Sequence, residues 1–244
     1  DIEAAAEAFH TALAPADDLG GALKEWLRKT HGMTIRTLPV HVMPDLRRRF
    51  DRHSMRLFLS ERLSLQDQLR EIAMETAQIA FHEALSKELD RLSLSSGEAR
   101  RIARFELARV AALALMMPYG SFLAAAQRLK YDLSALAARF RVSFEQAANR
   151  LTTLQRPGAA AIPFFLMEID SAGNRLRLSG AHGFPKARFG GNCPKLNVFS
   201  AFAQPGQVLA ERAEIFGGGE FLVVSRTIEG PQAGFGERVR RTAL

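Results

Sequence analysis

Apolar residues recur at helical spacing through the first 155 residues of the chain. In three segments, residues 65–76, 102–113 and 133–140, they return every three or four positions and so share one face of a helix. The pattern predicts that this part of the chain is mainly helical, with the apolar stripe of each helix turned to a core.

Signals for helix ends support this periodicity. The run Ser95-Ser96-Gly97-Glu98 offers N-caps for one helix, and Pro118 is expected to end that helix at Met117. Ser143 and Gln146 have the spacing of a capping box, which predicts another helix that begins after Ser143.

The composition changes near Gln155, because residues 156–244 hold 13 of the 18 glycines and 6 of the 10 prolines. Beyond this point, short β-branched, aromatic or alternating segments lie between turn clusters, which is typical of strands. The expected strands are residues 162–169, 175–179, 207–212 and 220–227. We therefore expect an α+β fold with a helical domain over residues 1–155 and a smaller, β-containing domain over residues 156–244.

Composition and charge narrow the class of protein. The longest apolar run, Val110 to Met117, is about a third of what a bilayer requires, so we expect no membrane association. Lys and Arg exceed Asp and Glu by 33 − 26 = 7, which favours an anionic partner. The single cysteine, Cys193, suits a reducing compartment, and we expect a cytoplasmic protein. The chain begins at Asp1 without a methionine, from which we expect a fragment or a processed product.

Part of the helical region carries a degenerate metallopeptidase motif. The stretches are residues 73–78, A-M-E-T-A-Q, and residues 108–118, A-R-V-A-A-L-A-L-M-M-P. They resemble the IrrE/ImmA-like metallopeptidases, whose hallmark is A-H-E-L-G-H on one helix. Two imidazoles four residues apart grip zinc there, and the glutamate activates the bound water. Here Met74 and Gln78 replace both histidines and only Glu75 remains, so we expect neither zinc nor peptidase activity.

Two other residues near this motif are weaker candidates for metal ligands. Glu106 lies near the place where the family supplies a third ligand, but without histidines we interpret it, like Glu75, as a solvated or ion-paired residue. His82 has no histidine partner four residues away on the same helix and is not expected to bind a metal.

A longer set of motifs extends beyond the peptidase helix. It comprises F-L-A-A-A at 122–126, Y-D at 131–132, L-A-A-R-F-R-V-S-F-E-Q at 136–146, R-L-T-T-L-Q-R-P-G at 150–158, I-P-F-F at 162–165 and G-F-P-K-A-R-F-G-G-N-C-P at 183–194. This ordered set, spread over most of residues 55–230, resembles the short-chain fatty acyl-CoA regulators. That family consists of bacterial transcription factors of propionate, acetate and related metabolism.

The resemblance implies a Cro-type helix-turn-helix upstream of Asp1, a non-peptidase IrrE-like middle domain and a C-terminal regulator domain. The chain would then be the effector-binding part of a regulator that senses short-chain acyl-CoA, contacts DNA through the upstream domain and forms homodimers or higher homo-oligomers. Some members carry an iron-sulfur cluster on C-terminal cysteines. With Cys193 alone we expect such a cluster only in a full-length protein. The alternatives are a divergent metallopeptidase and a purely structural dimerisation module.

Acyl-CoA needs cations for its phosphates and apolar surface for its adenine and acyl groups. Lys186 and Arg188 flank a Gly-Gly pair whose backbone amides suit an anion, although an exposed basic loop would look the same. The aromatic residues Phe164, Phe165 and Phe189 bracket this loop as acyl-pocket walls or as plain core. Tyr119 would hydrogen-bond a thioester carbonyl, or is a capped, half-buried tyrosine at a helix end.

One basic segment has no assigned role. Its arginines, Arg47, Arg48, Arg49, Arg52 and Arg56, lack a base-reading motif, and we interpret them as a solvated face.

Overall fold

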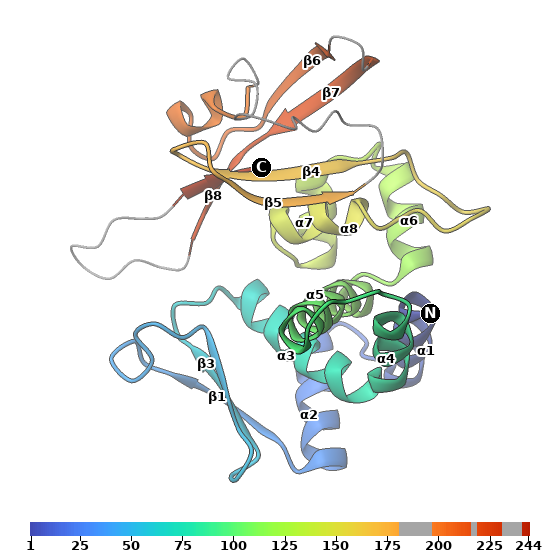
Figure 1. The fold of residues 1–244 in the computed structure, drawn as a ribbon, viewed down its shortest axis with the longest axis vertical. Coiled ribbons are helices and arrows are strands. Elements are labelled where there is room, and N and C mark those ends of the chain that lie inside the picture. Colours follow the sequence, from blue (N-terminus) through green and yellow to red (C-terminus); the bar gives the residue numbers. More distant parts are fainter. Residues whose placement is uncertain (181–196, 216–218, 231–240) are drawn as a thin grey trace. The chain divides into compact units, whose positions relative to one another are not determined.

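The computed structural model describes residues 1–180, 197–215, 219–230 and 241–244. These residues fold into two compact units, Asp1–Ser143 and Phe144–Leu244 (Figure 1). The first unit is mainly helical with one small sheet and the second is built mostly of strands, so the expected α+β class is confirmed. The second unit begins with a helix that precedes the composition change at Gln155.

The first unit contains helices before and after its small sheet. Its elements are α1 (Ile2–Leu13), α2 (Leu19–His31), β1 (Thr34–Leu38), β2 (Arg48–Asp51), β3 (Arg56–Ser60), α3 (Leu65–Ala80), α4 (His82–Asp90), α5 (Gly97–Met116), α6 (Tyr119–Arg128) and α7 (Leu133–Phe140). Figure 1 shows α3 and α5 packed side by side, and α1 also packs along α5. These three helices enclose the core of the unit.

Helix α5 shows how the sequence produces this packing. Its N-cap Ser96 accepts a hydrogen bond from the backbone of Ala99 at 3.1 Å, and the helix ends at Met116, with Met117 as its C-cap before Pro118. The second half of the helix is buried and rich in alanine, whose small side chain lets neighbouring helices approach closely. The expected start and end of this helix are therefore confirmed.

A three-stranded sheet with the order β1–β3–β2 completes the first unit. Strand β1 is parallel to the central strand β3, and β2 is antiparallel to it. Leu57 and Leu59 of β3 are buried on the inner face of the sheet. The sequence predicts a mainly helical region here and none of these strands, because each has five residues or fewer and no alternating apolar pattern of its own.

The second unit begins with a short helix and continues mainly as strands. Its elements are α8 (Phe144–Leu151), β4 (Phe165–Asp170), β5 (Arg175–Gly180), a 3₁₀ turn (Ser200–Ala203), β6 (Leu209–Ile215), β7 (Gly219–Ser225), β8 (Thr227–Glu229) and β9 (Arg241–Ala243). Helix α8 begins directly after Ser143, where the capping box predicts it. The four expected strands correspond to β4, β5, β6 and the β7–β8 segment, with ends that differ by a few residues.

Within the described part of the second unit the strands form a sheet with the order β5–β4–β9–β8 and a separate β6–β7 ribbon. Ile169, Val198, Ala201 and Ala243 form the buried cluster that joins the sheet to the 3₁₀ turn. Partly buried aromatic and aliphatic side chains, including Phe199, pack around this cluster. The strands therefore have a hydrophobic core of their own.

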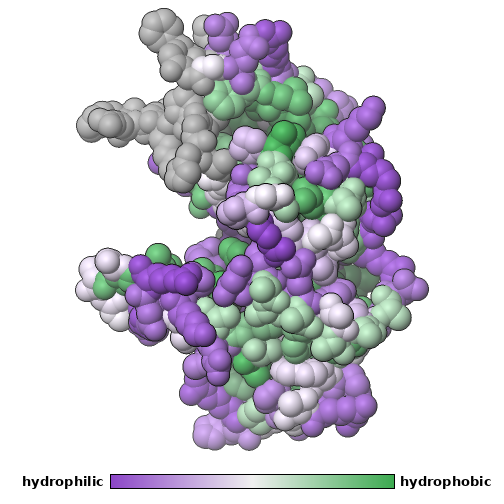
Figure 2. Space-filling model, turned by 90° about the vertical axis from the view of Figure 1, so that its right-hand side faces the viewer, coloured by the Kyte–Doolittle hydropathy of each residue, from purple (hydrophilic) through white to green (hydrophobic). Residues whose placement is uncertain are grey.

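The surface mixes polar and apolar residues. Figure 2 shows apolar patches set among hydrophilic residues on one face of the molecule. In the described part of the chain, no helix taken alone has both the length and the hydropathy to cross a membrane, whereas α5 and α6 taken as a bent pair meet both criteria.

Candidate functional site: a degenerate metallopeptidase helix

Helix α3 carries the remnant of the metallopeptidase motif. Ser64 caps the helix and accepts a hydrogen bond from the backbone of Asp67 at 3.1 Å. Met74 is buried, Glu75 is 6% exposed, and Gln78, one turn further on, is partly buried. The positions that would hold two imidazoles thus carry a thioether and an amide, both poor zinc ligands.

Glu75 is bound by an arginine from the sheet. Arg48 of β2 pairs in register with Leu59 of β3, so its side chain lies on the inner face of the sheet together with Leu57 and Leu59. From there the Arg48 guanidinium donates a hydrogen bond to Oε2 of Glu75. A side-chain cation therefore neutralises the glutamate that a zinc peptidase uses to activate water.

The ion pair belongs to a larger network on α3. Nη1 of Arg48 lies 3.7 Å from Oε2 of Glu71, and Nη2 of Arg70 lies 3.4 Å from Oε1 of the same glutamate. Arg70 also contacts Asp67 at 3.1 Å. Two buried carboxylates one helical turn apart would repel each other, and the two guanidinium groups compensate both charges. Together with Arg47, which lies 3.8 Å from Asp67, three arginines pair with three carboxylates in this network.

The other candidate metal ligands lie elsewhere. Glu106 is at the surface, with 57% of its side chain exposed, and contacts Arg109 at 3.6 Å. His82 is exposed at the start of α4. Among the described residues, no three His, Cys, Asp or Glu side chains are grouped so that they could hold a metal ion. This arrangement agrees with the ion-paired interpretation of Glu75 and the solvated interpretation of Glu106.

Tyr119 is the first residue of α6, directly after Pro118, and belongs to the first unit. It is 2% exposed, so it is more deeply buried than a half-buried tyrosine at a helix end. Close by in the sequence, the ring of Phe122 packs edge-on against Phe140 at a centroid distance of 5.0 Å. Tyr119 and Phe122 are thus both buried on α6. The contact of Tyr119 with a thioester stays a prediction.

Phe164 and Phe165 lie at the start of β4 in the second unit, and both are partly buried. Phe165 pairs with Gly180, the last residue of β5. Gly180 has a φ of 107°, and a Cβ there would lie 2.2 Å from the carbonyl oxygen of Phe164, so glycine is required. Lys186, Arg188 and Phe189 follow in the next segment and lie outside the described residues. Phe164 and Phe165 are consecutive in the sequence, and Tyr119 belongs to the other unit.

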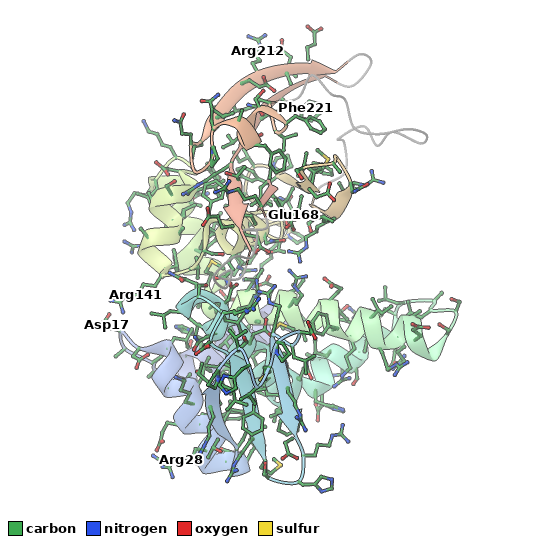
Figure 3. The ribbon with its side chains drawn as sticks, turned by 90° about the vertical axis from the view of Figure 1, so that its left-hand side faces the viewer. Asp17, Arg28, Arg141, Glu168, Arg212 and Phe221 are labelled. Atoms are coloured by element: carbon green, nitrogen blue, oxygen red, sulfur yellow. The ribbon has the colours of Figure 1, made fainter. Side chains whose placement is uncertain are left out.

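Three contacts that hold the strands of the second unit to α8 or to one another could not be predicted from the sequence. Arg177 of β5 donates to Oε1 of Glu145 at 2.9 Å, and the Arg226 guanidinium lies 5.1 Å from the centre of the Phe144 ring. Glu168, labelled in Figure 3, accepts a hydrogen bond from Thr242 at 2.9 Å and so joins β4 to β9. The residues of each pair are distant in sequence, so no local sequence pattern predicts these contacts.

Comparisons with known proteins agree with this arrangement. Residues 28–152 match the family described as the IrrE N-terminal-like domain, and residues 153–244 match the family described as the short-chain fatty acyl coenzyme A regulator, C-terminal. The chain belongs to the family of short-chain fatty acyl-CoA transcriptional regulators. The boundary between the two matches lies close to the change of composition.

Individual relatives give the same picture. The chain is 38% identical over 207 residues to the propionyl-CoA carboxylase regulator of Cereibacter sphaeroides. This alignment covers 85% of the chain and 44% of that protein. It is 34% identical to the HTH-type transcriptional regulator RamB of Mycobacterium tuberculosis, over 93% of the chain and 48% of the relative. The chain thus spans less than half the length of these two relatives.

A solved structure is also similar. It belongs to a transcriptional regulator of Mycobacterium tuberculosis and matches with a TM-score of 0.90 and 31% sequence identity. The match covers 100% of this chain and 74% of the other.

Proposed function

We propose that this chain is the effector-binding part of a bacterial transcriptional regulator that senses a short-chain acyl-CoA and controls genes of carboxylic acid and acyl-CoA metabolism. Two observations support the proposal. Residues 153–244 match the acyl-CoA regulator family, and the peptidase helix that precedes them has its glutamate bound by Arg48. The second observation carries the argument against the metallopeptidase alternative, because a guanidinium binds the glutamate with which such an enzyme activates water.

The proposal assigns the ligand's chemical groups to residues of the second unit. Lys186 and Arg188 bind the phosphates, where Arg188 offers two parallel donors and Lys186 a point charge. Phe164, Phe165 and Phe189 supply apolar surface for the acyl group. Tyr119 belongs to the first unit, and its hydrogen bond to the thioester carbonyl stays a prediction.

The proposal extends to the DNA contact, the location and the oligomeric state that are typical of this class of protein. The regulator contacts operator DNA through a helix-turn-helix upstream of this chain, works in the cytoplasm and forms a homodimer or a higher homo-oligomer. An iron-sulfur cluster would belong only to the full-length protein, since this chain has the single Cys193. Effector binding changes DNA affinity only if the two conformations of the regulator bind the acyl-CoA unequally.

Thermal unfolding with a ligand series tests the proposal. Propionyl-CoA, acetyl-CoA, free coenzyme A and propionate are each added to the 244-residue chain. A ligand at 100 times its Kd stabilises the folded state by about 2.7 kcal/mol, which raises the Tm by several degrees. We expect a clear rise with an acyl-CoA and a smaller one with either of its halves. No rise with any of the four would contradict the proposal.

A pair of arginine variants separates phosphate binding from general charge. Arg188→Ala is expected to remove most of the rise in Tm that propionyl-CoA produces. Arg175→Ala is the matched control, because Arg175 is an exposed arginine on β5. If Arg188→Ala keeps the full rise, Arg188 does not bind the phosphates. If both variants lose it equally, the effect is one of net charge.

A further inference from the structure

The outer face of the three-stranded sheet in the first unit presents a row of arginines around an aromatic ring. In register, Phe58 of the central strand β3 pairs with Arg36 of β1 on one side and with Arg49 of β2 on the other. Arg56, two residues before Phe58 on β3, lies on the same face. We call Arg36, Arg49, Arg56 and Phe58 the arginine face.

The opposite face of the sheet fixes this orientation. Leu57 and Leu59 are buried on the inner face, and Arg48 reaches Glu75 from that side. Neighbouring residues of a strand point to opposite faces, so Arg49 and Phe58 must point away from the core. Figure 3 is seen from the side on which these strands lie, with helices of the same unit behind them.

The positive charges of the arginine face are not compensated by ion pairs. Residues 34–60 contain six arginines, no lysine and two aspartates. Arg48 is used in the core, whereas Arg36, Arg49 and Arg56 are exposed and have no ion-pair partner among the residues that the structure describes. Asp51 pairs with Arg56 in register on this face, and its carboxylate accepts a hydrogen bond from Ser54 at 2.6 Å.

The arrangement of these arginines differs from that of the paired arginines on the surface of the unit. Arg28 and Arg91, for example, each pair with a glutamate three residues earlier in the chain. The arginine face, in contrast, gathers its cations across three strands. Strands β1 and β2 lie about 10 Å apart across β3, so the long guanidinium side chains can reach neighbouring phosphates of one nucleic-acid strand.

We propose that the arginine face is a second DNA contact of this protein, which binds the phosphate backbone of duplex DNA independently of its sequence. The choice of DNA as the occupant rests on the proposed function as a transcriptional regulator and on charge complementarity. The whole chain carries a net charge of +7, and four arginines of this segment, Arg36, Arg49, Arg52 and Arg56, are exposed and have no ion pair within the described part of the chain. A contact of this kind strengthens binding beside an operator and adds no base specificity.

The test measures binding of the 244-residue chain to a short fluorescent DNA duplex of mixed sequence by anisotropy, in the absence of acyl-CoA. The variant is Arg36→Gln/Arg49→Gln, and the matched control is Arg101→Gln/Arg128→Gln. The control arginines are also exposed, but they lie on α5 and α6. Thermal unfolding of all three proteins confirms that they are folded.

We expect the variant to bind roughly tenfold to a hundredfold more weakly than the wild type at about 50 mM salt. The slope of log K against log salt should fall by about 1.8, as for two lost phosphate contacts. The control should keep the wild-type slope. The proposal is overturned by a wild type that does not bind duplex DNA at low salt, by an unchanged slope in the variant or by an equal loss in the control.

Phe58→Ala distinguishes duplex DNA from single strands. In a duplex the bases are stacked on one another, so Phe58→Ala should leave duplex affinity unchanged within about twofold. Tighter binding to single-stranded DNA or RNA, lost in Phe58→Ala, would make the face a single-strand site and overturn the duplex proposal. A thermal shift with propionyl-CoA on the Arg36→Gln/Arg49→Gln variant reports on the proposed function independently.

Discussion

Arg48 donates a hydrogen bond to Glu75, and this contact joins the edge strand β2 of the three-stranded sheet to the centre of α3, the helix that carries the degenerate peptidase motif. Glu75 is the one residue of the zinc motif that this chain retains. In a peptidase the neighbouring positive charge is a metal ion, which exchanges ligands and binds water. Here it is a guanidinium, which has only donors and cannot activate water.

The Arg48–Glu75 pair is expected to stabilise the first unit. Arg48→Ala leaves Glu75 and Glu71 as buried carboxylates without compensation from the sheet, so we expect a loss of about 2 to 3 kcal/mol in the free energy of unfolding. Urea unfolding followed by circular dichroism measures this loss.

Arg47→Ala is the matched control for this variant. Arg47 is 50% exposed and lies 3.8 Å from Asp67, against 20% exposure for the Arg48 side chain. Its removal should cost less than about 1 kcal/mol, as for an exposed ion pair. Equal losses in the two variants would show that the contact with Glu75 stabilises the protein no more than an exposed ion pair does.

Removal of metal should leave the protein unchanged. Met74 and Gln78 cannot replace two imidazoles, and Arg48 already neutralises Glu75. We expect EDTA to leave the Tm unchanged and elemental analysis of the purified chain to show much less than one zinc per chain. Stoichiometric zinc, or peptide hydrolysis that EDTA abolishes, would restore the metallopeptidase alternative.

Gly180 should be a sensitive position in the second unit. Gly180→Ala places a Cβ 2.2 Å from the carbonyl oxygen of Phe164 at a φ of 107°, and we expect it to destabilise the protein by about 2 to 4 kcal/mol. Gly158→Ala is the control, since Gly158 also has a positive φ, 77°, but has open space around its Cβ position.

Gly158→Ala should cost about 1 kcal/mol, from backbone strain alone. Thermal unfolding of both variants measures the difference. Equal effects would show that the close approach of Gly180 to the backbone of Phe164 does not matter.

The turn between β4 and β5 should give a pH-dependent contribution to stability. Asp170 accepts hydrogen bonds from the side chain and backbone of Asn174, both at 2.8 Å. These bonds lower the pKa of Asp170 below 3.8, and the side-chain bond is the largest cause. A lowered pKa contributes stability above pH 3.8 that is lost as the pH falls through the lowered pKa.

Asp170→Asn has no charge to lose and provides the comparison. The difference in Tm between the wild type and this variant should be constant near neutral pH and shrink below about pH 4. A difference that stays constant down to about pH 2 would show that the carboxylate charge does not stabilise the turn.

The helices α3, α5, α7 and α8 and the strands β4 to β8 were predictable because their signals are local. Ser96 and Pro118 mark the ends of α5, and Asp170 bonded to Asn174 forms the turn between β4 and β5. The three-stranded sheet of the first unit was not predictable in the same way. Its strands are short, and β1 and β3 are parallel and joined by a long connection that contains β2.

The candidate site also has features that the sequence shows locally and features that depend on strand pairing. The loss of the zinc ligands is visible in the sequence, because the motif is six residues long. The role of Arg48 is not, since it depends on the register that places Arg48 opposite Leu59 and turns it toward α3. An interpretation of the whole arginine segment as solvated was therefore wrong for Arg48, and it is correct that Arg49 and Arg56 are exposed.

Isothermal titration of the chain with propionyl-CoA tests the effector proposal most directly. We expect saturable binding with about one ligand per chain, and binding of propionyl-CoA at least tenfold tighter than that of free coenzyme A or propionate, because only the thioester offers phosphates and acyl group together. Absence of heat at millimolar ligand, or equal affinity for propionyl-CoA and free coenzyme A, would contradict the view that this former peptidase scaffold senses acyl chains.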